Sequence, residues 1–169
     1  ICWLVGSDVE KVYALGGDFL GSMNFINYLQ VIMQFSNKSV AVADISWLTG
    51  PFLFNLEVHG TGGHLFLDVR YNHLEEVHGM RTPLDDLRGF KRRMSTIAKD
   101  VISKAFFRGA LAFYKQIYEG FFLSIERGGE PPIPGEDGLR VTAILEAAKF
   151  SIFENRPIKI RELFAAANR

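Results

Sequence analysis

The chain has 169 residues, of which 48% are hydrophobic and 22% charged, and its 19 basic and 19 acidic side chains give a formal net charge of zero. This balance excludes a disordered chain, and without a basic excess nucleic acid is not expected as a partner. The single cysteine, Cys2, excludes an internal disulfide framework and is typical of a reducing compartment, so we expect a cytoplasmic protein.

The first segment, residues 1–6, is apolar but too short for a signal peptide, and no basic region precedes it. It also lacks a starting Met, and we interpret it as the cut end of a longer chain. No apolar run approaches the ~20 residues needed to span a bilayer, so we expect no membrane association.

The first half of the chain is predicted to form strands. Between residues 24 and 35, apolar side chains such as Val31, Met33 and Phe35 alternate with more polar ones, which is the period of a strand. Residues 36–39 form a predicted turn, because Asn37 tolerates a positive φ. Strands joined this closely must pair antiparallel. The predicted strands cover residues 11–15, 24–35, 40–48, 52–59, 64–70 and 73–77.

The second half has helical spacing. Thr82 and Pro83 are typical of a helix start, and apolar residues then recur at intervals of three and four between residues 87 and 101. Gly109 is expected to break or kink this helix. A second apolar stripe covers residues 110–125 and ends at Gly128. The proline-rich residues 130–135 form a rigid connector, followed by a third helix over residues 141–152, a short edge strand over 158–160 and a last helix over 161–167.

Strands followed by helices indicate an α+β fold in one domain, residues 1–169. We expect a mostly antiparallel open sheet of about five to seven strands with helices packed on one face. The other face carries Tyr28 and Ile32 among Gln and Asn residues, a mixture too apolar for open water. We therefore predict that this face is an oligomer interface.

Three segments together resemble the C-terminal domain of the Gfo/Idh/MocA family, named after glucose–fructose oxidoreductase, inositol dehydrogenase and a rhizopine-catabolism protein. The first is residues 29–37 followed by residues 40–47, which end in Ser-Trp. The second is the E-V-x-G-T-x-G-x-L hairpin at residues 57–65. The third is residues 121–132 with G-E-D-G-L-R at 135–140 and R-P-I-K-I at 156–160. Where the family turn usually carries Asn-Gly, this sequence has Asn37 and Lys38.

The resemblance implies a parent NAD(P)-dependent oxidoreductase that moves a hydride between the nicotinamide and a sugar, polyol or related hydroxy compound. In the family, NAD or NADP binds to an N-terminal Rossmann domain, and a Lys there and a His with a nearby Asp handle the proton. Neither part is recognised in this sequence, which has no Gly-x-Gly-x-x-Gly after a strand. We therefore assign no catalytic residue, no cofactor-binding residue and no metal to this chain, and expect it to be inactive alone. Its partners would be its own Rossmann domain, a small-molecule substrate and further copies in a homodimer or tetramer.

The resemblance also implies a substrate wall at the end of the Ser-Trp strand and the start of the next. Aromatic rings there could stack on the C–H faces of a sugar, with hydroxyl side chains donating hydrogen bonds. Packing in the core or at an interface is the alternative role for these aromatic side chains. The candidate substrate-binding residues are Ser46, Trp47, Thr49, Phe52 and Phe54.

Other patterns have simpler interpretations. Residues 60–63, Gly-Thr-Gly-Gly, lie between two predicted strands and favour a hairpin turn over a phosphate cradle. The four histidines have spacings that match no standard zinc pattern. The basic segment 84–108 could bind an acidic partner or lipid. Its apolar stripe instead favours a helix that packs one face on the core and exposes its basic face to solvent. An alternative to the oxidoreductase is a stand-alone α+β interaction module without catalysis, or a family member that has lost catalysis.

Overall fold

The computed structural model describes residues 1–21, 24–48, 50, 53–69, 73–78, 94 and 109–167. The chain divides into two compact units, which we call unit 1 and unit 2. Unit 1 comprises Ile1–Gly50 and Ile133–Arg169, and unit 2 comprises Pro51–Pro132. A single domain over residues 1–169 stays a prediction.

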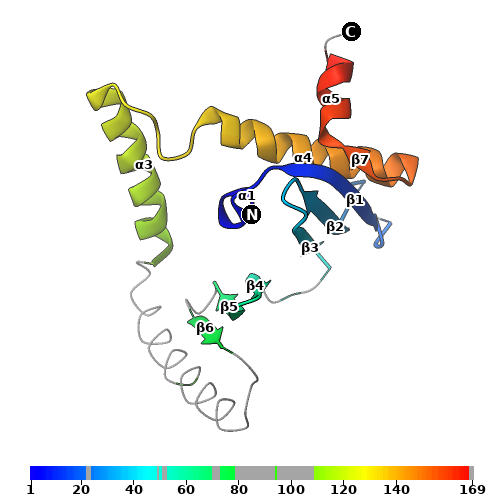
Figure 1. Ribbon diagram of the computed structural model, residues 1–169, viewed down its shortest axis with the longest axis horizontal. Helices are drawn as coiled ribbons and strands as arrows, with labels where there is room; N and C mark the ends of the chain where they lie inside the picture. Colours follow the sequence, from blue (N-terminus) through cyan, green and yellow to red (C-terminus); the bar gives the residue numbers. More distant parts are fainter. Residues whose placement is uncertain are drawn as a thin grey trace. The chain divides into compact units, whose positions relative to one another are not determined.

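Unit 1 is an antiparallel sheet in the order β3-β2-β1-β7 with helices against it. Figure 1 shows α4 lying along β1, with the short helix α5 following β7. Helix α4 begins at the predicted Pro-Gly boundary, with Glu136 and Asp137 in its first turn, where the helix dipole favours negative charge. The elements of unit 1 are α1 (Cys2–Val5), β1 (Val9–Gly17), β2 (Tyr28–Phe35), β3 (Val40–Ser46), α4 (Gly135–Glu154), β7 (Ile158–Lys159) and α5 (Ile160–Ala167).

The core of unit 1 lies between this sheet and α4. Along β2, Val31, Met33 and Phe35 are buried, whereas Gln30 and Ile32 on the other face are exposed. This confirms the predicted alternation and the packing of a helix on one face. The strand begins at Tyr28 rather than at residue 24, because the preceding residues form the connection from β1. The buried core residues are Val9, Val12, Ala14, Val31, Met33, Phe35, Ala147, Ala148 and Ile158.

A buried serine joins α4 to the sheet. The amide of Ala14 in β1 donates to Ser151 Oγ at 2.9 Å, and this hydroxyl donates to the carbonyl of Arg156 at 2.7 Å. Strand β7 pairs with β1 only at Lys11 and Val12, so the serine provides the next acceptor along β1. Ser151 is fully buried, and a buried hydroxyl needs such partners.

The turn between β2 and β3 differs from its prediction. The positive φ falls on Lys38, at 71°, and not on Asn37. The amide of Lys38 donates to the carbonyl of Phe35 at 2.9 Å, and Asn37 Oδ1 accepts from the amide of Ser39 at 3.0 Å. The prediction for Asn37 was wrong because this turn needs its left-handed residue last, and the Asn side chain instead bonds to the backbone.

Unit 2 contains a second antiparallel sheet, in the order β4-β5-β6, and the helix α3. The helix ends at Gly128, which has a φ of +64°, and the amide of Gly129 donates to the carbonyl of Ser124 at 2.9 Å. The predicted end at the two glycines is therefore confirmed. The predicted helix over residues 87–101 and the basic segment 84–108 lie outside the described residues, Met94 excepted. The elements are β4 (Asn55–Gly60), β5 (Gly63–Asp68), β6 (His73–Val77) and α3 (Gly109–Arg127).

The α+β class and the antiparallel pairing are confirmed. The described strands number seven, but they form a four-stranded and a three-stranded sheet, where one sheet was expected. Short connections require neighbouring strands to be antiparallel when they pair, but they do not require every consecutive pair of strands to bond.

Candidate functional site

Two of the predicted substrate-binding residues lie together where β3 ends. Ser46 Oγ accepts a hydrogen bond from the amide of Leu48 at 3.1 Å, which bends the chain after the strand. Trp47 follows with 73% of its surface exposed. Its indole meets the ring of Phe25 edge to face, with centroids 6.4 Å apart and planes at 86°. Trp47 therefore presents an exposed aromatic side chain next to Ser46, and its predicted role in a sugar wall stays a prediction.

A buried asparagine fixes this corner. The carbonyl of Asn27 accepts from the amide of Trp47 at 2.9 Å, and its Oδ1 accepts from the amide of Phe19 at 2.9 Å. Its Nδ2 donates to Asp18 Oδ1, which also accepts from the amides of Leu20 and Gly21. Asn27 is fully buried, so these bonds hold the two loops at a defined spacing.

Sequence reasoning missed most of the aromatic cluster that results. Phe19 meets Tyr28 edge to face, with ring centroids 5.7 Å apart. Phe19 and Phe25 are both exposed, and both lie in the connection between β1 and β2. In the sequence, this loop could have been recognised by Asp18 and Asn27, which flank a glycine-containing segment with two phenylalanines. The aromatic cluster comprises Phe19, Phe25, Tyr28 and Trp47.

Tyr28 faces a carboxylate on the neighbouring strand. Its hydroxyl donates to Asp44 Oδ2 at 3.3 Å, and Gln30 Nε2 donates to the same oxygen at 3.0 Å. Desolvation and the charge of Asp44 raise the pKa of Tyr28 above its ordinary value. The phenol therefore stays protonated at neutral pH and acts as a hydrogen-bond donor rather than a base.

Of the other three predicted residues, only Phe54 is among the described residues. Phe54 belongs to unit 2, where its carbonyl accepts from the amide of Val69 at 2.9 Å and its ring is 54% exposed. Thr49 and Phe52 lie outside the described residues. Ser46 and Trp47 lie at the end of β3, and a substrate-binding role for all five residues stays a prediction.

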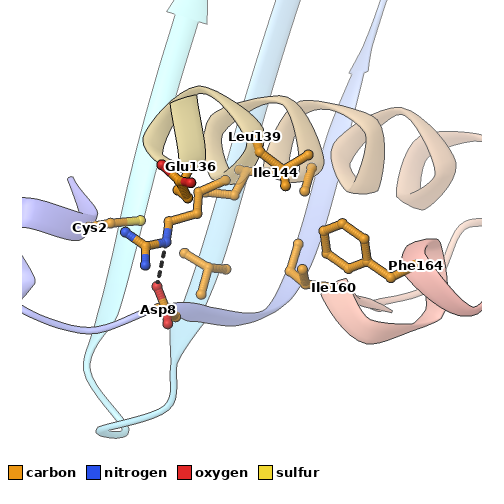
Figure 2. A pocket seen from close by; sticks show the side chains of 10 residues that line it. Cys2, Asp8, Glu136, Leu139, Ile144, Ile160 and Phe164 are labelled. Carbon is orange, nitrogen blue, oxygen red and sulfur yellow. Dashed lines mark ion pairs between the residues drawn. The ribbon is translucent and has the colours of Figure 1, made fainter. Parts of the chain in front are cut away.

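A cavity of about 340 Å³ lies between α1, α4, α5 and the start of β1. Figure 2 shows Cys2 and Asp8 at one end of it and Ile160 and Phe164 at the other. The volume suits a small molecule, but two of the three charged groups that line it, Asp8 and Arg140, already pair with each other, and the third is Glu136. Arg140 lies 3.2 Å from Asp8 and 2.8 Å from Asp137. The walls are otherwise mainly apolar, so the cavity lacks the convergent polar groups of a sugar site among the described residues.

The glycine-rich residues 60–63 do not fit a dinucleotide. They close the β4–β5 hairpin and lead into a strand, whereas a phosphate cradle leads into a helix. A Cβ on Gly63 would lie 2.5 Å from the carbonyl oxygen of Val77, so β6 already occupies the space beside this backbone. The predicted hairpin turn is confirmed.

Among the helices of the described residues, none combines the length and the hydropathy that a membrane crossing requires. A cytoplasmic location stays a prediction.

Known proteins share this fold. A family model described as "Oxidoreductase family, C-terminal alpha/beta domain" matches residues 1–160. A myo-inositol 2-dehydrogenase from Thermotoga maritima is 24% identical over 166 residues, which cover 95% of this chain and 46% of that protein. The chain therefore spans less than half the length of this curated relative.

Solved structures share the fold at low identity. The WlbA dehydrogenase from Bordetella pertussis, in complex with NADH and UDP-GlcNAcA, has a TM-score of 0.65 at 21% identity, covering 94% of this chain and 43% of that one. An oxidoreductase from Agrobacterium radiobacter, in complex with NAD+, L-tartaric acid and magnesium, has a TM-score of 0.64 at 17% identity, covering 96% and 46%.

Proposed function

The chain belongs to the Gfo/Idh/MocA oxidoreductase family as its C-terminal alpha/beta domain, and on this premise we propose that it is the substrate-side and oligomerisation domain of an NAD(P)-dependent oxidoreductase. The match over residues 1–160 is the observation that carries the proposal. The nucleotide would bind to a separate N-terminal Rossmann domain, because the glycine-rich hairpin at residues 60–63 does not fit it.

The proposed substrate is a sugar, a polyol or a related hydroxy compound. A hydroxyl that becomes a carbonyl loses a hydride and a proton, so the enzyme must hold that hydroxyl at a fixed place against the nicotinamide. The names of the relatives support this class, since one is a myo-inositol 2-dehydrogenase and another was solved with UDP-GlcNAcA. The name of a relative describes that relative, and for this chain the substrate class is our proposal.

The aromatic cluster would supply one wall of the substrate site. Trp47 is exposed, and Phe25 stands against its ring, while Asn27 fixes the backbone beneath them. Exposed, rigid aromatic rings suit the apolar C–H face of a ring sugar, and Ser46 lies next in the chain as a hydroxyl partner. Thr49, Phe52 and Phe54 remain predicted substrate-binding residues from the family resemblance.

The face of the unit 1 sheet opposite α4 would carry the assembly. Ile32, Val40 and Val42 on this face are 43%, 63% and 63% exposed, and Leu15 lies there too. Apolar side chains gathered on an open sheet face favour contact with a second copy in a homodimer or tetramer. The same face supports the alternative function, an assembly module without catalysis.

The complete natural protein tests the reaction. It would be assayed with NAD+ and with NADP+ against a panel of polyols, sugars and sugar acids, following the absorbance of the reduced nicotinamide. We expect turnover with at least one member of the panel. A complete protein that reduces neither nucleotide with any member would favour the assembly module. The chain alone is expected to be inactive and to show no heat of binding with NAD(P)(H).

The two tryptophans of the chain allow a matched test of the substrate wall. Trp3 is 92% exposed on α1, and Trp47 is 73% exposed in the aromatic cluster. A sugar that stacks on the cluster should change the fluorescence of the chain at millimolar concentration, and this change should disappear in Trp47→Ala and persist in Trp3→Ala. A change that survives Trp47→Ala would contradict the wall.

Light scattering across a dilution series tests the assembly. We expect a dimer or tetramer at micromolar concentration and a shift toward monomer in Val42→Lys, which puts a charge on the open face. A wild-type chain that is monomeric throughout would contradict the role of this face.

A further inference from the structure

The β4–β5 hairpin brings together two histidines and a glutamate that the sequence keeps apart. His59 pairs directly with His64 across the ladder, and their rings stack with centroids 4.5 Å apart and planes at 4°. Glu57 lies two residues before His59 on the same strand, so its side chain is on the same face. The spacing of five between the histidines matches no helical metal motif, but a tight hairpin makes it a cross-strand pair.

The distances between these groups are close to those of a metal site. Glu57 Oε2 lies 3.6 Å from His59 Nε2 and 3.8 Å from His64 Nε2, and the three ligand atoms all lie within 4.8 Å of one another. Two ligands held at ~2.1 Å from a tetrahedral Zn²⁺ are about 3.4 Å apart. Closing the set requires a rotation of His59 out of its stack on His64, on a side chain that is 73% exposed.

The present contacts leave one of these groups, His64 Nε2, without a partner. At 3.6 Å and 3.8 Å the nitrogen–oxygen separations exceed hydrogen-bond length. His64 Nε2 is covered from solvent and has no hydrogen-bond partner in the described part of the chain. A covered ring nitrogen without a partner costs free energy, and a cation between it and the carboxylate would remove that cost.

We propose that Glu57, His59 and His64 bind a divalent first-row transition ion, with Zn²⁺ as the reference ion. Two imidazoles and a carboxylate are ligands that Zn²⁺ and its neighbours prefer, whereas Mg²⁺ prefers oxygen ligands throughout. Three protein ligands leave a fourth position of a tetrahedral ion open to water or another small ligand. The exposed sides of Glu57 and His59 give the ion a path to the site. The proposal does not depend on the proposed oxidoreductase function.

The histidine at the neighbouring strand end provides a matched control. His78 follows β6, is 72% exposed and lies 2.9 Å from Glu76, and its Nδ1 lies 3.1 Å from the carbonyl oxygen of Gly62 in the hairpin turn. Its replacement therefore also reports whether contact with the turn matters for binding. It is not part of the Glu57–His59–His64 set.

The experiment titrates Zn²⁺ into the whole chain at neutral pH in competition with a chromophoric chelator. We expect one ion per chain and a loss of affinity of about tenfold or more in His59→Gln and in Glu57→Gln, because each removes one of three ligands. His78→Gln should bind as wild type does, and excess Mg²⁺ should not displace Zn²⁺. Histidine NMR signals should shift for His59 and His64 on addition of Zn²⁺ and stay in place for His78.

Equal affinity in wild type, His59→Gln and Glu57→Gln would overturn the proposal, as would binding that disappears in His78→Gln. Circular dichroism of each variant separates loss of the site from loss of the fold. Because Glu57 and His59 are exposed at the surface, their replacement should leave the spectrum unchanged.

Discussion

The two sheets bury different kinds of side chain among the described residues. In unit 1 the buried side chains are aliphatic or aromatic, and the two buried polar ones, Asn27 and Ser151, have hydrogen-bond partners. In the described part of unit 2, the buried side chains are His73 and Glu75, whose Nε2 and Oε2 atoms lie 4.0 Å apart. Removing ionisable groups from water costs free energy, whereas burying apolar side chains stabilises the fold. Among the described residues, the buried apolar side chains therefore lie in unit 1.

The register explains why unit 2 differs. Cross-strand pairing gathers most titratable side chains of β4, β5 and β6 on one face, and leaves the other face mainly leucine and valine. In unit 1 the same alternation separates an apolar buried face from a mixed exposed one. A strand pattern thus predicts which residues share a face, but it does not say which face is covered. The titratable face carries Glu57, His59, His64, Asp68, His73 and Glu75.

Phe35→Ala should have the largest effect on stability among the changes that test this comparison. Phe35 is 1% exposed in the core of unit 1, so the change should lower the free energy of unfolding by about 3–5 kcal/mol. Hydrogen exchange should speed up at β1 and β2 more than at β4 and β5. The control is Val42→Ala on the open face, with an expected cost below ~1 kcal/mol. Equal acceleration in both sheets would show that the two units unfold together.

Removal of the hydroxyl that joins α4 to β1 should have the next largest effect. Ser151→Ala leaves the buried amide of Ala14 without its acceptor and removes the donor to the carbonyl of Arg156. We expect a loss of about 1–3 kcal/mol in denaturant unfolding. Thr142→Ala on the same helix is the control, because its exposed hydroxyl only donates to the carbonyl of Gly138. A Ser151→Ala chain as stable as wild type would mean that water replaces the serine.

A glycine-to-alanine change in a helix of each unit tests how much room each helix has for a side chain. A Cβ on Gly120 in α3 would lie 2.6 Å from Pro132 Cγ, whereas a Cβ on Gly138 in α4 would meet nothing within 4 Å. Gly120→Ala should therefore destabilise by about 1–2 kcal/mol and Gly138→Ala should stabilise by about 0.5–1 kcal/mol. Thermal unfolding of both variants measures the signs. A stabilising Gly120→Ala would show that the proline moves aside easily.

The smallest expected effect concerns a surface ion pair of unit 1. The hydrogen bond from Arg156, at 3.1 Å, lowers the pKa of Glu162 below its ordinary value. Because the folded pKa is the lower one, this contribution to stability is present above the unfolded pKa and is lost as pH falls through the folded pKa. Arg156→Gln should raise the pKa of Glu162 and flatten that part of the stability profile.

The measurement for this pair is a carboxyl NMR titration. Arg140→Gln is the control, since Arg140 pairs with Asp8 and Asp137 and should leave Glu162 unchanged. A Glu162 pKa that is the same in wild type and Arg156→Gln would contradict the assignment of the shift to Arg156.

The sequence predicted the helices and strands better than it predicted the contacts between them. The alternation of β2, the glycine end of α3 and the start of α4 followed from local patterns, because periodicity and turn residues act over a few positions. The corner at Trp47 was located, but its support by Asn27 was not, since that support depends on two loops meeting in space. The cross-strand pairing of His59 with His64 could have been found, because a two-residue turn within residues 60–63 sets the register.

The four-stranded sheet has two unlike edges. On one side β7 is two residues long, and Ser151 occupies the next hydrogen-bonding position of β1. On the other side β3 presents seven residues of edge backbone, with Val40 and Val42 exposed along it. An extended strand from another molecule can add to such an edge, and a lysine there is a common natural protection. Misassembly of this protein at high concentration should therefore start at β3, and a charged substitution in that strand is the first change to make when preparing it.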